Sequence, residues 1–440
     1  MPQFIIIADD LTGANDTGVQ FAKKGFSTVS LLDLSQQEYI QDAEVLVYNA
    51  ETRSLEPNAA YECIKTIANQ LPFAESSCIY KKIDSTMRGN VGAEMDGIMD
   101  VHKFDLAVVV PAYPKGSRLT VGGYHLVHQA LLEDSEFSKD PKCPVKESYL
   151  PSLLARQTRR KIGHIGIKEI RNQLDLAKQI KALTRNGTQI ILFDAAVQHD
   201  LKAVAEAVAC SGLRCLWVGS AGLAQSLADQ SVDHDANEFI YDRLFSPSED
   251  PIFVIAGSVS EVTKQQVQQL SNLQGYKVIS ADPLGILDED SSFEWERLVN
   301  QILEVIDQGH SPILTTDSSV HAREAVQKWG NSQKKDSLFI GNRIADQLGR
   351  LGSYIMSQRK FSGLIATGGD IAFRFCHHME VKALRILDEV EPGIPLSQII
   401  GGSGDGLPIV TKAGAFGNPS SFVNAVNKIK ENKTFIRGIN

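Results

Sequence analysis

The sequence predicts a two-domain α/β protein in which each domain has a mainly parallel sheet flanked by helices. The chain has 440 residues, more than a single hydrophobic core usually supports. Short β-branched runs alternate with amphipathic stretches almost throughout, which is the pattern of parallel strands joined by crossover helices. The polar, acid-rich stretch Asp229–Asp250 interrupts this alternation and predicts a linker. We therefore expect domains over residues 1–228 and 251–440, joined by a linker over residues 229–250.

Apolar and β-branched runs in the first half are predicted to be strands, at Phe4–Ala8, Thr28–Leu32, Val45–Tyr48, Ile79–Ile83, Leu106–Val110, Ile190–Phe193 and Leu216–Val218. Amphipathic patterns between them predict helices at Thr17–Lys24, Asn58–Gln70, Val91–His102 and Leu201–Cys210. Lys23, Lys24 and Gly25 support the end of the first helix, because cations stabilise a helix C-terminus and glycine often follows it.

The same alternation resumes after the predicted linker. Strands are expected at Ile252–Ala256, Lys277–Ser280, Ile313–Thr316 and Leu364–Thr367. Helices are expected at Glu261–Leu273, Glu294–Gln308 and Ile340–Gln358. Open parallel sheets present the carboxyl ends of their strands to ligands, so two such domains predict an active site in the interdomain cleft.

Composition and charge exclude several classes of protein. A formal net charge of −9 argues against a broad contact with nucleic-acid phosphates. No apolar run reaches the roughly 18–20 residues that span a membrane. The first apolar run, Phe4–Ala8, lacks a preceding basic region and a small-residue cleavage site, so it predicts a strand instead of a signal peptide. Six scattered cysteines without a C-x-x-C pair are typical of reduced thiols, and we expect a cytoplasmic protein.

Two carboxylates follow the first predicted strand directly. Asp9 and Asp10 come after Ile5–Ala8 and precede a turn rich in threonine, glycine and asparagine. Carboxylates at the carboxyl end of a strand can accept hydrogen bonds from sugar hydroxyls or bind a metal ion. The structural alternative is that Asp9 or Asp10 caps the turn and that Asp16 caps the next helix.

A second polar cluster occupies residues 80–90, where a strand leads into an Asp-Ser-Thr turn. Alternation along the strand predicts Lys82 and Asp84 on one face. Lys82 could bind an anionic substrate or a transferring phosphoryl group, and Asp84 could accept the proton of an attacking hydroxyl. Ser85 offers a short donor, and Arg88 could bind a carboxylate with two hydrogen bonds. The alternative is a Lys–Asp pair at an exposed strand end.

Arginines follow two further predicted strands. Arg53 comes shortly after Val45–Tyr48, and Arg118 lies in the Pro/Gly loop after Leu106–Val110. An arginine after a strand is commonly a solvated surface residue. Because the carboxyl ends of parallel strands share one edge of the sheet, these cations together with the aspartates and lysines predict an anion-binding pocket.

The second domain contains three glycine-bearing loops, Gly257–Lys264, Gly368–Ala372 and Val410–Gly417. Glycines between a strand and a helix let the backbone approach phosphates, and a helix N-terminus adds free N–H groups. Lys412 could neutralise phosphate charge and Asp370 could help to place Mg²⁺. The alternatives are ordinary tight turns, a surface lysine and a helix cap. None of the loops matches a P-loop or a dinucleotide-binding fingerprint.

These segments, in this order, resemble the four-carbon acid sugar kinase family. The family patterns present here are ADD-x-T-G-x-x-D at residue 8, K-x-D-S-T-x-R-G-N-x-G-A-E at residue 82, G-S-x-S-x-x-T-x-x-Q at residue 257, T-G-G-[DE] at residue 367 and K-x-G-x-F-G at residue 412. The resemblance therefore covers nearly the whole chain. One departure is Ser117-Arg118-Leu119, where members often have Gly-Arg-Thr.

The resemblance implies an N-terminal sugar-acid domain, a C-terminal nucleotide domain, and transfer of phosphate from ATP, with Mg²⁺, to the 4-hydroxyl of a four-carbon sugar acid. D-Threonate is the expected acid, and D-erythronate and 3-oxo-tetronate are the alternatives. The residues expected to bind the sugar acid are Asp9, Asp10, Arg53, Lys82, Ile83, Asp84, Ser85 and Arg88, of which Asp84, Asp10 and Lys82 are the candidates for catalysis. The residues expected to bind ATP are Ser258, Gly368, Gly369, Asp370, Ile371, Lys412, Gly414 and Gly417, with Asp370 also a candidate Mg²⁺ ligand.

Two other classes of function compete with a kinase. A non-catalytic sugar-acid receptor would leave the three glycine loops of the second domain unexplained. A nicotinamide-dependent dehydrogenase would need a dinucleotide fingerprint, which the sequence lacks. The expected partners are therefore a small sugar acid and ATP, with no nucleic acid and no membrane, and a homodimer is the suggested assembly.

Overall fold

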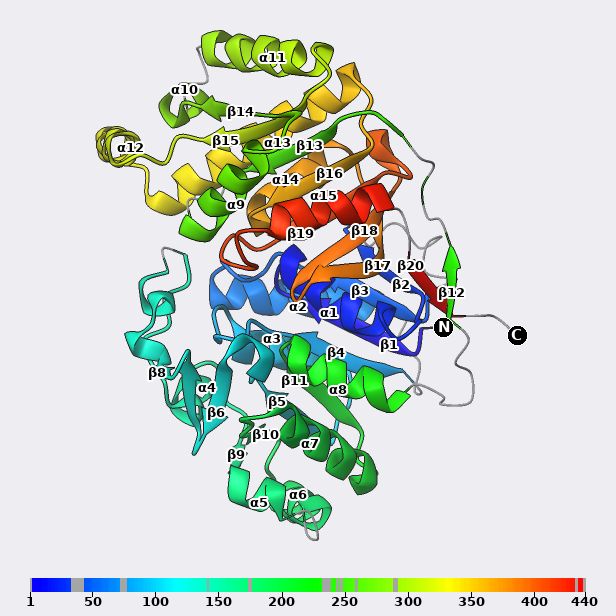
Figure 1. Cartoon of the computed structure of the whole chain (residues 1–440). Coiled ribbons are helices and arrows are strands. Elements are labelled where there is room, and N and C mark those ends of the chain that lie inside the picture. The colour runs from blue at the N-terminus through cyan, green and yellow to red at the C-terminus, as the bar shows by residue number, and fades with distance from the viewer. Residues whose placement is uncertain are drawn as a thin grey trace. The chain divides into compact units, whose positions relative to one another are not determined.

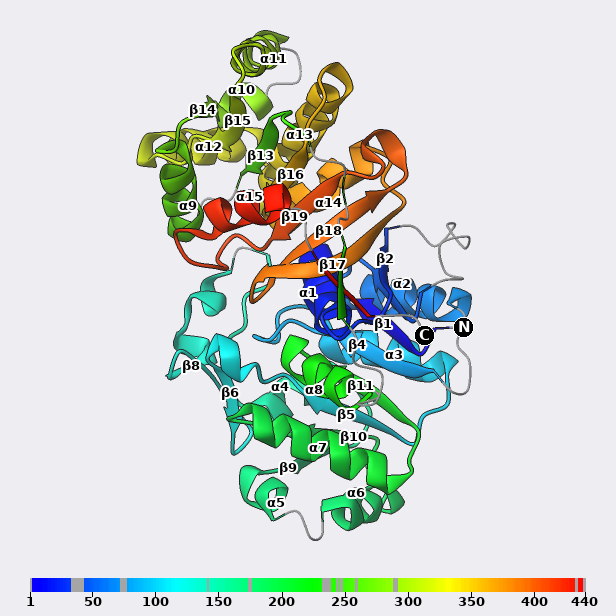
Figure 2. The same cartoon turned by 45° about the vertical axis from the view of Figure 1, so that its right-hand side comes forward.

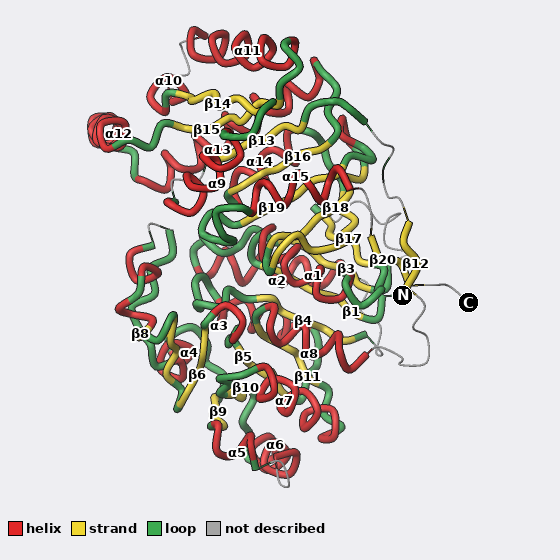
Figure 3. Tube along the Cα trace, in the orientation of Figure 1, coloured by secondary structure: helices red, strands yellow, loops and turns green. Residues whose placement is uncertain are grey.

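The computed structural model describes residues 2–32, 43–71, 77–140, 142–172, 176–231, 239–242, 245, 248–257, 260–287, 292–431 and 434–437. The chain forms two compact units, Met1–Asn237 and Glu238–Asn440 (Figure 1). Within each unit, strands and helices alternate along the chain (Figure 3). The predicted α/β class with two domains and mainly parallel sheets is confirmed.

The first unit is built on a parallel sheet. Its described strands lie in the order β2–β3–β1–β4–β11–β5–β10–β9, and every pairing between them is parallel. Their bounds are β1 Phe4–Ala8, β2 Thr28–Leu31, β3 Val45–Asn49, β4 Cys78–Lys82, β5 Leu106–Val110, β9 Ile162–Ile165, β10 Ile190–Phe193 and β11 Cys215–Gly219. The central strands β1 and β5 are fully buried, as continuous apolar runs in a parallel sheet require.

Helices of the first unit form two groups that cover opposite faces of this sheet, as right-handed crossovers require (Figure 2). One group packs in the order α1–α8–α7 and continues to α5 and α6, and the other packs α2 against α3 and α3 against α4. Their bounds are α1 Leu11–Ala22, α2 Pro57–Gln70, α3 Val91–Val101, α4 Leu150–Ala155, α5 Ile167–Arg171, α6 Leu176–Arg185, α7 Gln198–Ser211 and α8 Ala221–Ser231. The side chains between the sheet and the group α1, α8, α7, α5 and α6 form a large apolar core.

A long excursion, residues 111–161, separates β5 from β9. It contains a small antiparallel sheet of β6 Arg118–Val121, β7 Tyr124–Val127 and β8 Ala130–Leu131. Neither these strands nor β9 were predicted, because they are short and most of their residues are at least partly exposed, which weakens the apolar signal.

The second unit has a mixed sheet in the order β14–β15–β13–β16–β19–β18–β17. The first five strands are parallel, and β18 and β17 continue the sheet antiparallel. The bounds are β13 Ile252–Ala256, β14 Tyr276–Ala281, β15 Ser311–Thr316, β16 Gly363–Thr367, β17 Ala383–Glu391, β18 Ile394–Ile400 and β19 Pro408–Lys412. β17 was not predicted, because it carries charged residues along its length, and β18 was not predicted either. β19 was also missed: the predicted glycine-bearing loop Val410–Gly417 begins within this strand and starts as a loop only after Lys412.

The helices of the second unit are α9 Glu261–Ser271, α10 Pro283–Leu287, α11 Ser292–Asp307, α12 Val320–Gln333, α13 Ser337–Gln358, α14 Gly369–His378 and α15 Ser421–Glu431. A separate pair of strands, β12 Phe239–Asp242 and β20 Thr434–Arg437, is antiparallel. Strand β12 lies inside the stretch predicted as the linker, and residues 232–238, 243–244 and 246–247 of that stretch lie outside the described residues.

The start of α1 differs from the prediction. The helix was expected from Thr17, after a turn, with Asp16 as a possible cap, but it begins at Leu11. The side chain of Asp10 accepts a hydrogen bond from the N–H of Gly13, so Asp10 is the N-cap and the predicted turn is the first part of the helix. Asp16 therefore lies within the helix and does not cap it.

Candidate active site

Three neighbouring strands of the first unit bring the predicted sugar-acid residues to one edge of the sheet. Ala8, the last residue of β1, is paired with Asn49 of β3 on one side and with Lys82 of β4 on the other. The segments that follow these strands therefore lie together. They contain Asp9 and Asp10 after β1, Arg53 after β3, and Ile83 to Arg88 after β4.

Arg53 bridges the two aspartates after β1. Its Nε lies 2.7 Å from Oδ2 of Asp9 and its Nη2 lies 2.9 Å from Oδ1 of Asp9. Its Nη1 and Nη2 lie 2.7 Å from the two carboxylate oxygens of Asp10. Burial alone would raise the pKa of Asp9, but the Arg53 guanidinium and the nearby Lys81 and Lys82 hold this pKa below its ordinary value. Asp9 therefore stays ionised, and four hydrogen bonds to the two aspartates hold the Arg53 guanidinium in place.

The two lysines at the end of β4 have different surroundings, because neighbouring residues in a strand point to opposite faces. Lys81 is fully buried, and its Nζ lies 2.7 Å from Oε2 of Glu94 in α3. It also donates to the backbone carbonyls of Lys82 (3.0 Å) and Ile7 (3.4 Å). Burial raises the pKa of Glu94, although Lys81 opposes this shift. Lys81 thus forms a buried ion pair with Glu94 of α3.

Lys82 is also buried, with 4% of the residue exposed, but no described residue makes a hydrogen bond or ion pair with its ammonium group. The Nζ of Lys82 lies close to Gly13. A Cβ added to that glycine would lie 2.8 Å from this Nζ and 2.5 Å from Oδ1 of Asp10, so Gly13 leaves room for both groups. A buried cation without a bound acceptor is costly unless a ligand supplies one. The alternative of an exposed Lys–Asp pair at the strand end is therefore wrong for Lys82.

Asp84 is bound by Arg88 through two hydrogen bonds, from Nε at 2.8 Å and from Nη2 at 3.1 Å. The backbone N–H and the hydroxyl of Thr86 donate to the same carboxylate. Burial would raise the pKa of Asp84, but Arg88 and Arg53 hold it well below its ordinary value. Arg88 is itself held by Asp140 at 2.9 Å. Asp84 is thus a permanently ionised acceptor near neutral pH.

The remaining predicted residues of this turn, Ile83 and Ser85, differ in their burial. The side chain of Ile83 is buried, and its backbone N–H donates to the carbonyl of Gly219. Ser85 is partly exposed in the turn.

The excursion between β5 and β9 adds residues to the same region. The ring of Phe137 lies 5.1 Å from the guanidinium of Arg88 and 6.0 Å from that of Arg118. Ser117, where family members often have glycine, adopts a left-handed conformation with φ of 58°. The loop therefore keeps the backbone conformation that glycine favours, although the residue has changed.

In the second unit, Lys412 is not the surface residue that the alternative prediction described. Only 1% of it is exposed, and its ammonium donates to three carbonyl oxygens of the loop that follows, those of Ala413 (2.9 Å), Gly414 (3.0 Å) and Phe416 (3.2 Å). The side chains of Ser260 and Thr263 in the adjacent segment also donate to the carbonyl of Gly414. Gly414 and Gly417 therefore lie in a loop whose carbonyls are bound by buried side chains.

The loop Gly368–Ile371 forms the beginning of α14. Gly368 has φ of 98° and is the N-cap, without a side-chain hydrogen bond. The first turn of a helix leaves N–H groups free for an anion, and Asp370 is exposed in that turn. Asp370 is therefore not the helix cap of the alternative prediction. Ser258 lies outside the described residues.

Metal ligands are sparse in the structure. Across the part of the chain that the structure describes, no group of three or more His, Cys, Asp or Glu residues could hold a metal ion. Mg²⁺ in kinases is commonly held by one or two carboxylates together with substrate phosphates, so Asp370 alone beside the glycine loops is compatible with such an ion.

A cavity of about 480 Å³ lies at the carboxyl ends of β13, β14 and β15 in the second unit. Its lining is rich in hydroxyl groups and includes Ser280, Thr315, Thr316 and the N-terminal cap of α12, Ser319. Its position at the strand ends is where open α/β sheets bind ligands. None of these residues was predicted, since serines and threonines after strands are common in ordinary turns.

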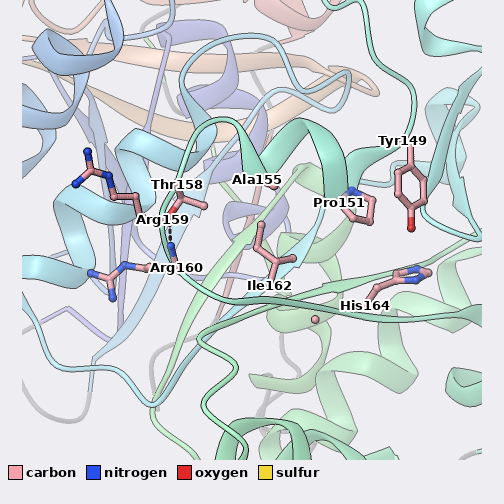
Figure 4. Close-up of a pocket in the computed structure, with 9 residues that line it drawn as sticks. Tyr149, Pro151, Ala155, Thr158, Arg159, Arg160, Ile162 and His164 are labelled. Atoms are coloured by element: carbon pink, nitrogen blue, oxygen red, sulfur yellow. Dashed lines mark hydrogen bonds between the residues drawn. The ribbon is translucent and has the colours of Figure 1, made fainter.

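Another pocket, of about 560 Å³, lies between α4 and β9 in the first unit (Figure 4). Tyr149 and His164 lie on one side of it and Arg159 and Arg160 on the other. His164 is bound to the buried Asp194 at 2.8 Å, and Arg160 is bound to Asp96. None of the predicted site residues lines this pocket.

Sequence reasoning missed residues that hold the site together. In the first unit these are Glu94, Phe137 and Asp140, and in the second unit they are Ser260, Thr263 and Gln266. The last three are the S, T and Q of G-S-x-S-x-x-T-x-x-Q, so the spacing of that pattern was a signal that could have identified them.

Comparison with known proteins supports the division of roles between the units. A D-threonate kinase of Salmonella typhimurium is 33% identical over 98% of this chain and 99% of its own length. A D-erythronate kinase of Heliobacterium modesticaldum is 30% identical over 97% of both chains. The sequence profile of a sugar-binding N-terminal domain matches residues 4–227, and that of a nucleotide-binding C-terminal domain matches residues 253–422.

The chain belongs to the four-carbon acid sugar kinase family.

Within this kinase family, the sugar-binding profile covers Asp9 to Arg88 and the nucleotide-binding profile covers Gly368 to Gly417. A crystal structure from Salmonella typhimurium, described as a putative tRNA synthase, has the same fold with a TM-score of 0.80. It covers 96% of this chain and 98% of its own, and at 23% identity it shows the fold alone. Across the described residues, no helix combines the length and the apolar character needed to cross a bilayer.

Proposed function

We propose that this chain transfers the γ-phosphoryl group of ATP to the 4-hydroxyl of a four-carbon sugar acid, with D-threonate as the expected acid. The observation that carries the proposal is Lys82, a buried ammonium without a described protein acceptor beside the Asp9–Asp10–Arg53 cluster. The Lys82 ammonium therefore needs an anionic partner, which the substrate would supply. Lys82 lies in the half of the chain that matches a sugar-binding domain.

The aspartates have the properties of acceptors for sugar hydroxyls. Asp84 has a pKa well below its ordinary value, since Arg88 and Arg53 outweigh the effect of burial, and it therefore remains ionised at neutral pH. Such a carboxylate orients the attacking hydroxyl by accepting its hydrogen bond. Phosphoryl transfer passes through a loose transition state that asks little of a base, so orientation by Asp84 or Asp10 suffices.

Lys82 has one of two roles in this proposal. Its ammonium either binds the carboxylate of the sugar acid or stabilises the charge that spreads over the transferring phosphoryl group. The first role predicts that its loss mainly raises KM for the acid, and the second that its loss mainly lowers kcat.

The nucleotide is expected at the glycine loops of the second unit. The N–H groups at the start of α14 and in the loop after Lys412 are donors suited to phosphate oxygens. Mg²⁺, when bound, would bridge the phosphates, and Asp370 is the proposed protein ligand. The hydroxyl-lined cavity at the ends of β13, β14 and β15 offers room for the nucleoside. Ser258 remains a proposed contact from the family pattern, and the interdomain position of the active site remains a prediction.

The decisive experiment is coupled ATP consumption with D-threonate, D-erythronate and 3-oxo-tetronate as separate substrates. We expect turnover with at least one acid, with the highest kcat/KM for D-threonate. A preference for another acid would reassign the substrate within the family, since one repositioned hydroxyl can change specificity strongly. Binding of the acids without ATP turnover would instead indicate a receptor and overturn the kinase. A cytoplasmic location and a homodimer stay predictions, and sedimentation of the purified chain tests the latter.

A further inference from the structure

The ammonium of Lys412 has no donor left for a phosphate. It carries three N–H bonds, and three carbonyl oxygens of the following loop, at Ala413, Gly414 and Phe416, lie within 2.9–3.2 Å of it. The residue is almost completely buried, and the ring of Phe422 lies 5.9 Å away on another side. Lys412 therefore faces the inside of the loop.

Three side chains of the segment that begins α9 hold the same loop. The hydroxyls of Ser260 and Thr263 donate to the carbonyl of Gly414 at 2.7 and 2.8 Å. The amide of Gln266 donates to the carbonyls of Phe416 and Asn418 at 3.1 and 2.9 Å. The carbonyls of residues 413, 414, 416 and 418 are thus all drawn toward Lys412 and α9.

This inward direction of the carbonyls determines where the N–H groups point. In a trans peptide the C=O of one residue and the N–H of the next point in opposite directions. Inward carbonyls at Ala413, Gly414 and Phe416 therefore place the N–H groups of Gly414, Ala415 and Gly417 on the outer side of the loop. Within the described part of the chain these three N–H groups have no acceptor, whereas the N–H of Phe416 donates to the carbonyl of Ala413 and that of Asn418 to Oγ of Ser421.

The outer side of the loop is open to a ligand. Ala415 and Gly417 are exposed and Gly414 is partly exposed. Gly417 has φ of 82°, and a Cβ at that position would lie 2.3 Å from Oγ of Ser421, so a side chain there would be strained and would clash. Several N–H groups that converge from one loop form a concave anion site, and the buried charge of Lys412 behind them increases its attraction for phosphate.

From this geometry we infer that Lys412 is a positioning residue, which with Ser260, Thr263 and Gln266 orients the N–H groups of Gly414, Ala415 and Gly417 toward a nucleotide phosphate. This role replaces direct contact between Lys412 and phosphate, and it rests on the proposed nucleotide site. In this arrangement the ammonium of Lys412 binds the carbonyls of the loop, and the groups that bind the phosphate are backbone N–H groups.

The test compares ADP affinity, measured by titration calorimetry, across variants of the full chain. Lys412→Met should weaken ADP binding by roughly 10- to 100-fold, because three carbonyls lose their donor and the loop can turn. Thr263→Val and Gln266→Leu should each weaken it by roughly 3- to 10-fold, and of the two only Gln266 lies outside the lining of the cavity proposed for the nucleoside. Arg359→Met is the matched control, since Arg359 pairs with Asp307 on the surface of the same unit and does not line the hydroxyl-lined cavity, and ADP affinity should stay within about twofold.

Two further readouts separate positioning from direct contact and from misfolding. Hydrogen–deuterium exchange of the peptide over residues 413–418 should become faster in the ADP-free Thr263→Val and Gln266→Leu variants, and D-threonate binding should be unchanged if the variants are folded. The inference fails if Lys412→Met binds ADP like the wild type. It also fails if Lys412→Met abolishes binding while Thr263→Val and Gln266→Leu leave both affinity and exchange unchanged, which would indicate direct contact. Wild-type ADP binding without phosphorylation of any acid would overturn the proposed function and leave this inference intact.

Discussion

Lys81 and Lys82 are neighbours in sequence, equally buried, and opposite in their bonding. Lys81 has a carboxylate partner in Glu94, whereas Lys82 has no described partner and lies beside Asp10. At the scale of single residues, this contrast separates a side chain that stabilises the fold from one that awaits a ligand. It also provides a pair of variants with the same chemistry and different expected effects.

Replacement of each lysine by methionine tests this contrast. Lys82→Met should lower kcat/KM by roughly 10²- to 10³-fold while the free energy of unfolding stays equal or rises, because an unpaired buried charge is removed. Lys81→Met should lower the free energy of unfolding by about 3–5 kcal/mol, because Glu94 is left buried and unpaired. Urea denaturation and steady-state kinetics measure both. Equal destabilisation by the two changes would mean that Lys82 has a structural role after all.

A second residue-scale prediction concerns pH. Burial lowers the pKa of Lys412 to about 7, with Glu391 opposing the shift. Bound phosphate favours the ammonium, so ADP affinity should fall as pH rises from about 6.5 to 8.5, and binding at pH 8 should take up a proton. Calorimetry in buffers with different ionisation enthalpies detects that proton. Lys412→Arg keeps its charge throughout, so it should show no uptake; uptake of the same size in Lys412→Arg would assign the proton to another group.

At the scale of elements, the turn between β5 and β6 stores strain at one residue. Ser117 occupies the left-handed region, which costs a residue with a side chain about 1–2 kcal/mol. Ser117→Gly should therefore raise the free energy of unfolding by about 0.5–1 kcal/mol, the remainder being offset by the greater freedom of glycine in the unfolded chain.

Gly116, the neighbour of Ser117, is the control for this prediction. A Cβ there would lie 2.7 Å from Cδ1 of Tyr113 and 3.0 Å from Nη1 of Arg118, so Gly116→Ala should destabilise the turn. Thermal unfolding of both variants in one buffer gives the comparison. If Ser117→Gly lowered the melting temperature, a specific contact of the Ser117 side chain would outweigh the backbone strain.

The elements also show how much the sequence could predict. Continuous apolar runs predicted the buried strands β1, β5, β10 and β13 with the observed bounds, because burial on both faces leaves a strong signal. The same reasoning missed β6 to β9 and β17, whose exposed or charged residues have no clear period. It also missed β18, in which Ser397 and Gln398 interrupt the apolar run, and β19, whose last residues were predicted as part of a glycine-bearing loop. The helix α1 was expected from Thr17, with Asp16 as a possible cap, because glycine and asparagine suggested a turn before it. The hydrogen bond from Gly13 to Asp10 shows that the helix begins earlier.

The candidate site divides in a similar way. Residues that follow parallel strands, such as Asp9, Arg53 and Lys82, could be predicted to lie together because the strand ends share one edge. Which residue pairs with which could not be predicted. Nothing local in the sequence indicates that Lys81 pairs with Glu94, 13 positions away, or that Gln266 binds Phe416 and Asn418, 150 and 152 positions away. Tertiary packing alone brings them together.

At the scale of the whole molecule, the two units should respond differently to acid. The buried carboxylates Asp9 and Asp84 and the partly buried Asp140, whose pKa is lowered by arginine partners and backbone donors, all lie in the first unit. Because their folded pKa lies below the unfolded value near 3.8, their contribution is complete above that value and is lost as pH falls through the lower folded pKa. The described carboxylates with lowered pKa in the second unit, Glu261 and Asp307, are exposed.

Acid titration therefore should unfold the first unit before the second, with stability nearly constant from about pH 7 to 5 and falling below about pH 4. Trp217 is the single tryptophan of the first unit, and Trp295 and Trp329 belong to the second. Fluorescence of a Trp295→Phe, Trp329→Phe variant follows the first unit, and ADP binding follows the second. Simultaneous loss of both signals would show that the units unfold together.

The excursion over residues 111–161 has a consequence for how members of this family diverge. It reaches the pocket through Phe137 and Asp140, which touch Arg88, while Asp9, Arg53 and Lys82 stand on the sheet itself. Mutations can therefore accumulate in this segment and reshape the wall around the substrate without moving the strand-borne groups. Exchange of the whole segment between relatives is accordingly expected to change the acid preference while the strand-borne residues stay unchanged.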